Sequence, residues 1–303
     1  MGLANVVAES PQPEIHVMKT FRQLVASERP LVLPGAHDAI SARLIQRAGF
    51  RAYFIGGFPL VGARYGVPDI GLMGLGEIEA GVRDIMAASD LPVLVDCDNG
   101  YGDVKTVVHT INTYERLGAQ AVFFEDQISP KRCGHIQGKR LFSTEQMEGN
   151  IRAAADNRIN PETFIIARTD AREVFDLDEA LRRGERYIRA GADGLFVEAP
   201  INVDELERIG RTFDVPQLAN MLEGGRTPLL TPAELEQLGF RIVIYGISLL
   251  MHAVQAMKNV LSGLAHGKID FAGKGVEFED YKSIVGLERW AEIEAKYQQA
   301  NGR

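Results

Sequence analysis

The fold of this chain is most clearly indicated by the segment Leu117-Gly118-Ala119-Gln120-Ala121-Val122-Phe123-Phe124-Glu125-Asp126. A helical apolar period ends at Leu117, and Gly118 suits the left-handed conformation that ends a helix. The apolar run 121–124 that follows is typical of a strand buried on both faces of a parallel sheet. Two acids, Glu125 and Asp126, stand where that strand ends. The segment therefore predicts a helix, a tight joint, a buried strand and a polar strand end, in that order.

The same joint recurs along the chain at Gly49, Gly191 and Gly239, each just past a helical pattern and just before an apolar run. The apolar runs predicted as strands are residues 31–33, 52–55, 93–95, 121–124, 164–167, 194–197, 217–219 and 241–245. Helical patterns occupy residues 39–48, 78–88, 104–117, 145–155, 178–189, 203–211 and 232–238. Alternating strands and helices imply right-handed crossovers and a parallel sheet. Eight such units predict an α/β fold, a closed (β/α)8 TIM barrel, as the single domain of residues 1–303.

Both ends of the chain extend beyond this barrel. Residues 1–14 are expected to be a flexible N-terminal arm. After the last strand we expect a helix over residues 249–264, a glycine-rich linker, and an amphipathic helix over residues 281–298 that contains Trp290. Because this last helix must bury its apolar face, we expect the segment 276–300 to be an assembly element swapped between subunits of a homotetramer, a dimer of dimers.

Composition excludes several classes of partner. The 303 residues carry 33 Lys+Arg against 41 Asp+Glu, a formal net charge of −8, which argues against a general nucleic-acid or anionic-membrane surface. We expect no membrane helix, since no stretch approaches the roughly 18 uncharged apolar residues that one needs. The N-terminus does not resemble a signal peptide, and 2 cysteines are too few for a disulfide framework, so a cytoplasmic protein is expected.

Charged side chains gather at the predicted strand ends, where parallel barrels carry their active sites. Asp96 and Asp98 are two positions apart, so they share one face of the strand while Cys97 faces the other way. Together with Glu125, these oxygen ligands suit a hard divalent cation such as Mg²⁺. Arg168 can bind a carboxylate through a bidentate fork, or it can pair with Asp170. Taken singly, each acid could instead be a helix cap.

The most specific segment, Lys131-Arg132-Cys133-Gly134-His135, follows the fourth predicted strand and should lie over the mouth of the barrel. Its cations would lower the pKa of the Cys133 thiol and make it a suitable proton donor or acceptor. The alternative is a solvated basic loop with an incidental cysteine.

These motifs, with Val95–Gly102, Glu125-Asp126-Gln127 and Ala167-Arg168-Thr169-Asp170-Ala171, resemble the isocitrate lyase/phosphoenolpyruvate mutase superfamily over nearly the whole chain. The Cys133 loop looks like the lyase branch, and Asn220-Met221-Leu222-Glu223-Gly224-Gly225 is most similar to the 2,3-dimethylmalate lyase and petal-death-protein group. Methylisocitrate lyases belong to the same branch.

The resemblance implies roles for individual residues. Mg²⁺, or Mn²⁺, would be held by Asp96 and Asp98, with Asp69 and Glu125 reaching it through water. Cys133 would be the catalytic acid/base, with His135 beside it, and Tyr53 would deprotonate the 2-hydroxyl of the substrate. Ile55 stands where family members have a substrate-binding serine. The expected substrate contacts are Gly56, Gly57, Lys131, Gly134, Arg168, Glu198, Asn220, Met221 and Leu222.

One departure from the family narrows the expected substrate. Methylisocitrate lyases have an arginine just after the eighth strand that holds a third carboxylate, and Met251 stands nearest to that position here. Leaving a carboxylate unpaired and desolvated costs several kcal/mol. We therefore expect an oxo-acid-lyase type enzyme that cleaves a substituted, 2,3-dimethylmalate-like dicarboxylate to an α-keto acid such as pyruvate. Methylisocitrate lyase, an oxaloacetate hydrolase or decarboxylase, and a non-enzymatic metabolite-binding barrel are the alternatives.

Overall fold

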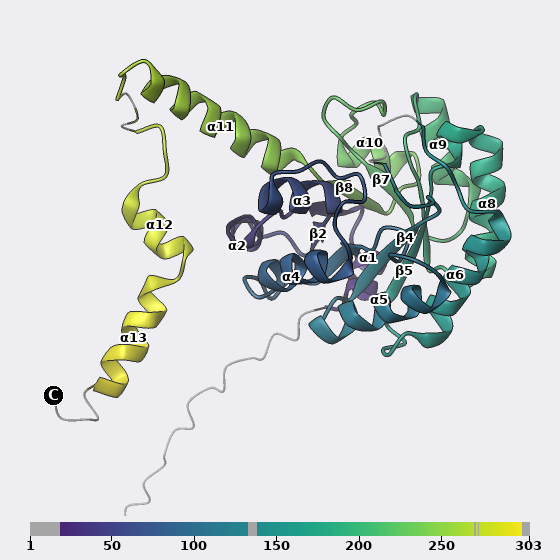
Figure 1. Cartoon of the computed structure of the whole chain (residues 1–303), viewed down its shortest axis with the longest axis horizontal. Helices are drawn as coiled ribbons and strands as arrows, with labels where there is room; N and C mark the ends of the chain where they lie inside the picture. Colours follow the sequence, from purple (N-terminus) through teal and green to yellow (C-terminus); the bar gives the residue numbers. More distant parts are fainter. Residues whose placement is uncertain (1–18, 133–137, 270, 272, 299–303) are drawn as a thin grey trace, which may run out of the picture.

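The barrel predicted from the sequence is present in the computed structural model, which describes residues 19–132, 138–269, 271 and 273–298. Its eight strands are β1 (Leu31–Pro34), β2 (Tyr53–Ile55), β3 (Val93–Asp96), β4 (Ala121–Glu125), β5 (Phe164–Thr169), β6 (Gly194–Val197), β7 (Gln217–Asn220) and β8 (Ile242–Tyr245). All neighbours are parallel, in the order β1-β8-β7-β6-β5-β4-β3-β2, and a parallel bridge from Gly35 to Phe54 joins β1 to β2. Figure 1 shows the helices arranged around this barrel.

The helices follow the predicted alternation, with additions. They are α1 (Phe21–Ser27), α2 (Ala39–Arg47), α3 (Gly57–Tyr65), α4 (Leu75–Met86), α5 (Val104–Leu117), α6 (Thr144–Asn157), α7 (Ala171–Val174), α8 (Leu177–Arg189), α9 (Val203–Thr212), α10 (Pro232–Gln237), α11 (Ser248–Ala265), α12 (Phe278–Ile284) and α13 (Leu287–Gln298). The four joint glycines all have positive φ angles, from 84° at Gly49 to 112° at Gly191, as expected for residues that end helices.

Alternation along the strands divides the core into two layers. Leu94, Phe123 and Phe196 point into the barrel, whereas Val93, Val95 and Cys97 pack under the surrounding helices. Helix α1 closes the N-terminal end of the barrel, where the Phe21 ring lies 5.8 Å from that of Phe164. The carboxyl ends of the strands are left for the site.

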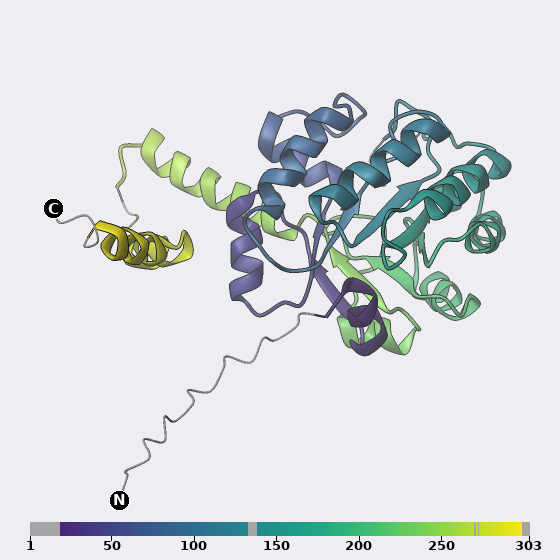
Figure 2. The same ribbon diagram turned by 90° about the horizontal axis from the view of Figure 1, so that it is seen from below.

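The C-terminal helices do not complete the barrel but extend from it (Figures 1 and 2). The segment 281–298, expected as one helix, is divided between α12 and α13 at Gly286, whose φ is 76°. Helix α12 contacts α2, where Arg47 donates a hydrogen bond of 3.1 Å to Ser283. Large apolar side chains of α11 and α13 remain exposed, including Leu261 and Trp290, each at 63%. In the part of the chain that the structure describes, no helix has the length and apolar character to span a membrane.

Candidate active site

A cavity of about 520 Å³, open to solvent, lies at the carboxyl ends of the strands. Its wall has three regions: acids on the β2–β4 side, a central arginine over aromatic rings, and apolar residues toward β7 and β8. The lining residues are Phe54, Gly56, Gly57, Phe58, Pro59, Asp69, Asp96, Phe123, Glu125, Lys131, Arg132, Arg168, Phe196, Glu198, Asn220, Leu222, Ile244, Gly246 and Ile247.

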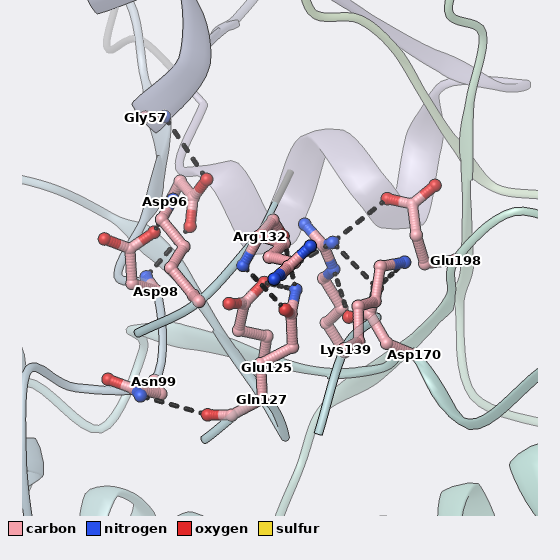
Figure 3. A network of polar contacts seen from close by, with 12 residues as sticks. Gly57, Asp96, Asp98, Asn99, Glu125, Gln127, Arg132, Lys139, Asp170 and Glu198 are labelled. Carbon is pink, nitrogen blue, oxygen red and sulfur yellow. Dashed lines mark hydrogen bonds and ion pairs between the residues drawn. The ribbon is translucent and has the colours of Figure 1, made fainter. Parts of the chain in front are cut away.

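The acidic region begins at the end of β3. The Asp96 carboxylate accepts hydrogen bonds from the backbone N–H of Gly57, at 3.2 Å, and from that of Asp98, at 2.9 Å. Asp98 has a φ of 48°, a left-handed conformation uncommon outside glycine. Asp98 and Asp69 are both more than 90% buried. In Figure 3, Asp96 and Asp98 lie on one side of Glu125 and Glu198 lies on the other.

Lys131 lies between two of these acids. Its ammonium is 2.8 Å from each carboxylate oxygen of Asp69 and also contacts Asp98. Burial would lower the pKa of Lys131, but the carboxylates of Asp98 and Asp69 raise it well above its usual range. Burial also raises the pKa of Asp98, to about 7, because the opposing effect of Lys131 is only partial. Among the described residues, no group of three His, Cys, Asp or Glu side chains forms a ready metal cluster.

Glu125 has one buried carboxylate oxygen that is not hydrogen-bonded by any described residue. Its Oε2 accepts a hydrogen bond of 3.2 Å from Gln127 and lies 3.4 Å from Arg168, whereas its buried Oε1 has no hydrogen-bond partner among the described residues. Burial raises the pKa of Glu125 well above its usual range. An unpaired buried oxygen beside further carboxylates is the donor set that a hard, partly hydrated cation prefers. These residues therefore fit a divalent metal ion.

Arg168 occupies the centre of the cavity wall. Its Nε and Nη2 donate to the two oxygens of Asp170 at 3.0 and 3.1 Å, so the predicted fork exists and its partner in the protein is Asp170. The same guanidinium lies 3.5 Å from Glu198 and 5.3 Å from the ring centroid of Phe196. Burial would lower the pKa of Arg168, but its acidic neighbours, Asp170 first, raise it well above its usual range. The guanidinium is thus a permanently charged, fixed group.

A second buried network of charged side chains positions Arg168 through its partner Asp170. Lys139 donates to Asp170 at 2.6 Å and lies 2.7 Å from Glu173, with its side chain fully buried. Asp126 accepts hydrogen bonds from the backbone N–H of Asp170, at 2.9 Å, and from the Thr169 hydroxyl, at 2.7 Å. The sequence did not reveal this role of Lys139, because its partners are more than thirty positions away. No local spacing signals that pairing.

Sequence reasoning also missed the aromatic floor of the cavity. Phe54, Phe123 and Phe196 line it from three strands, and the Phe123 ring lies 5.8 Å from Phe54 and 5.7 Å from Phe196. Strand alternation is the signal that could have found them, because each lies one position away from a residue of the outer layer.

Most of the predicted residues converge on the cavity, and several do not. Gly56, Gly57, Asp69, Asp96, Glu125, Lys131, Arg168, Glu198, Asn220 and Leu222 line it, and Asp98 is joined to it through Lys131. Asn220 donates to Glu198 at 3.5 Å. Met251, expected beside the substrate, is instead 37% exposed on α11 and is not among the lining residues. Cys133, Gly134 and His135 lie outside the described residues.

Tyr53 and Met221 require correction, because the structure places them in the outer core. Tyr53 packs with Ile55 and Val93 under the helices, and its buried hydroxyl has no hydrogen-bond partner among the described residues. Burial, followed by the charge of Asp90, raises the pKa of Tyr53 above its ordinary value, which opposes a role as a base. Met221 is fully buried in the same layer, where its sulfur accepts a 3.4 Å contact from the backbone N–H of Leu230. In both pairs the neighbouring residue, Phe54 or Leu222, faces the cavity.

Comparison with known proteins identifies the family. The family model described as phosphoenolpyruvate phosphomutase matches residues 21–265. The chain is 42% identical over 288 residues to 2,3-dimethylmalate lyase of Eubacterium barkeri, covering 93% of this chain and 98% of that protein. The structure of oxaloacetate acetylhydrolase with the inhibitor 3,3-difluorooxalacetate matches with a TM-score of 0.87 at 29% identity, covering 94% and 97% of the two chains.

A third relative contains a metal ion. The structure of phosphonopyruvate hydrolase in complex with oxalate and Mg²⁺ matches with a TM-score of 0.82 at 28% identity, covering 91% of this chain and 97% of that one. The family model spans most of the chain, and the curated relative is matched almost from end to end. The chain therefore belongs to the phosphoenolpyruvate mutase/isocitrate lyase superfamily and is an enzyme that catalyses carbon–carbon bond cleavage.

Proposed function

We propose that this enzyme is a Mg²⁺-dependent lyase that cleaves a substituted malate-type 2-hydroxy dicarboxylate into an α-keto acid, such as pyruvate, and a carboxylate. One observation carries the proposal: the charges of the cavity are unevenly distributed. The cationic lining residues among those described are Lys131, Arg132 and Arg168, whereas the β8 side is lined by Ile244, Gly246 and Ile247. A dicarboxylate with an apolar branch matches that distribution better than a tricarboxylate does.

The acidic region would hold the metal. Asp96 and Asp98, with Asp69 and Glu125, would bind Mg²⁺, or Mn²⁺ in its place. The bound ion would stabilise negative charge that develops on substrate oxygens. The similarity to a Mg²⁺-containing hydrolase and the unpaired Oε1 of Glu125 support this assignment.

The other cavity residues would bind and orient the substrate. Arg168 is held by Asp170 with its guanidinium at the wall of the cavity, so it would bind the carboxylate of the hydroxy-acid end. Glu198 and Asn220 would face the second fragment. With Tyr53 in the outer core, the carboxylates that line the cavity are the available bases for the 2-hydroxyl. Deprotonation of the 2-hydroxyl would let the C2–C3 bond of the substrate break, and Cys133 would protonate the resulting carbanion.

A turnover screen tests this reaction. Purified enzyme with Mg²⁺ is incubated with 2,3-dimethylmalate, 2-methylisocitrate, citramalate and oxaloacetate, and the products are separated by chromatography. We expect two organic fragments from 2,3-dimethylmalate or citramalate and little cleavage of 2-methylisocitrate. Preference for 2-methylisocitrate would contradict the proposed substrate class.

A substitution of Cys133 tests its proposed role as the proton donor. Cys133→Ser should abolish cleavage while Mg²⁺ and pyruvate still bind in calorimetric titrations, because the thiol is needed only for proton transfer. Cys97→Ser is the matched control, since Cys97 is fully buried in the outer core and should not contribute to chemistry. Full activity of Cys133→Ser would refute the assignment.

A second activity has one observation in its favour, the similarity to oxaloacetate acetylhydrolase. In the same screen, hydrolysis of oxaloacetate would yield oxalate and acetate, whereas decarboxylation would yield pyruvate and CO₂. Either reaction, in the absence of malate cleavage, would replace the proposed one.

The C-terminal helices would assemble the enzyme into a homotetramer, in which each subunit contributes them to a neighbour. On α11 the residues Val254, Met257, Leu261 and Leu264 recur at helical spacing and are 38 to 63% exposed, an apolar stripe that favours a protein partner. Light scattering after size exclusion should give a tetramer for the intact chain and smaller species for Leu261→Glu. Leu229→Glu, at an exposed apolar residue of the loop after β7, is the control. A monomeric intact chain would refute this assembly.

A further inference from the structure

We propose that the ammonium of Lys131 is a tethered cation that competes with the divalent metal ion for Asp69 and Asp98, so that one must leave before the other binds. The inference rests on the metal site of the proposed function and concerns a residue that was expected only to contact substrate. Lys131 would then determine how tightly the enzyme binds its metal ion.

The geometry of the ammonium is that of a bound cation. Lys131 Nζ lies 2.8 Å from both oxygens of Asp69 and contacts Asp98, while its side chain is only 7% exposed. Three carboxylate oxygens therefore surround one positive charge in a site almost closed to water. Asp69 and Asp98 are also two of the four carboxylates that the proposed metal site requires.

The space around this ammonium is confined on the side of α3. A Cβ atom added to Gly57 would lie 3.1 Å from Lys131 Nζ and 3.3 Å from an Asp69 oxygen, so the backbone of Gly57 lies directly against this ion pair. A metal ion bound by Asp69 and Asp98 would also stand within a few ångströms of the ammonium, where like charges repel strongly in a buried site. Binding of one cation therefore excludes the other.

Lys139 provides a matched comparison within the same chain. Its ammonium is equally buried, at 2.6 Å from Asp170 and 2.7 Å from Glu173, on the arginine side of the cavity. Neither of those acids belongs to the proposed metal site. Loss of the Lys139 charge removes a buried lysine without removing the competitor.

The test is direct measurement of Mn²⁺ binding to the full-length enzyme, by electron paramagnetic resonance of free Mn²⁺ and by calorimetry, without substrate. If the Lys131 ammonium is bound to the acids in most of the metal-free protein, removing the lysine strengthens the apparent metal affinity. The gain is about the ratio of lysine-bound to lysine-free protein. We expect Lys131→Met to bind Mn²⁺ about tenfold more tightly than wild type, and Lys139→Met to stay within about threefold of it. Lys131→Gln, which keeps a polar group against the acids, should behave like Lys131→Met and serves if the methionine variant does not fold.

The outcomes separate this inference from the proposed reaction. Wild-type or weaker Mn²⁺ affinity in a folded Lys131→Met or Lys131→Gln enzyme would overturn the competition, even if wild-type enzyme cleaves 2,3-dimethylmalate. An equally large gain in Mn²⁺ affinity in Lys139→Met would also overturn the competition. The gain would then come from losing any buried positive charge and not from losing Lys131 in particular. Tightening confined to the Lys131 variants supports it, even if the substrate screen fails and the proposed reaction must be abandoned.

Discussion

Replacing Asp170 by alanine should destabilise the protein more than any exposed ion pair could, because it leaves two buried cations with a shared partner missing. The fully buried Asp170 carboxylate accepts from Lys139 at 2.6 Å and from Arg168 at 3.0 and 3.1 Å. These are three charge-assisted hydrogen bonds to one side chain. Asp170→Ala removes all three of them.

The expected loss of stability depends on which ion-pair partners Lys139 and Arg168 keep in the variant. Removing one partner of a buried ion pair typically costs about 3–5 kcal/mol. Lys139 keeps Glu173 at 2.7 Å, and Arg168 keeps Glu125 and Glu198 at 3.4 and 3.5 Å, so neither charge is stranded completely. We therefore expect the lower end of that range, a loss of about 3 kcal/mol in the free energy of unfolding. Asp170→Asn keeps one acceptor oxygen and should lose less.

The assay is urea unfolding followed by far-ultraviolet circular dichroism, with Asp178→Ala as the matched control. Asp178 also pairs with an arginine, Arg208, at 2.5 Å, but the two side chains are 69% and 54% exposed. Exposed pairs contribute about 0–1 kcal/mol, so this variant should unfold close to wild type. A free energy of unfolding for Asp170→Ala within about 1 kcal/mol of that for Asp178→Ala would show that the buried ion pairs contribute no more than an exposed one.

Three further predictions concern pH, packing and specificity. Burial lowers the pKa of His37 from 6.5 despite Asp38, so the unfolded chain takes up this proton first and stability should fall as pH drops below 6.5. Urea midpoints of His37→Gln from pH 7.5 to 5 should fall less steeply than those of wild type; parallel curves would contradict this. Gly210→Ala should lower the thermal midpoint sharply, because its Cβ would lie 2.1 Å from the Leu238 carbonyl oxygen; an unchanged midpoint would contradict that packing. Ile247→Arg places a cation on the apolar side of the cavity, so the kcat/KM ratio of 2-methylisocitrate to 2,3-dimethylmalate should rise at least about tenfold, and an unchanged ratio would argue against that side as the specificity wall.

The elements of the barrel were predictable because their signals are local. Each predicted strand lies within two residues of the observed one, since a short apolar run bounded by a glycine joint and a charged end needs no distant partner to be recognised. Helix α3 was missed because Gly57, Pro59 and Gly62 weaken its helical pattern, and its formation depends on packing against the barrel. The break at Gly286 was missed for the opposite reason, since the amphipathic pattern of the sequence continues through it.

The residues that gather at the carboxyl ends of the strands could be predicted from the sequence alone, because a parallel barrel brings every strand end to one edge. Which of two adjacent residues faces the cavity depends instead on the folded barrel: it is Phe54 rather than Tyr53, and Leu222 rather than Met221. A shift of one residue in register turns a strand's side chains to the opposite face, and register is set by pairing with neighbouring strands. The position of Lys131 between Asp69 and Asp98 likewise could not be predicted from local sequence. Its buried ion pair with Asp69 joins residues that are 62 positions apart.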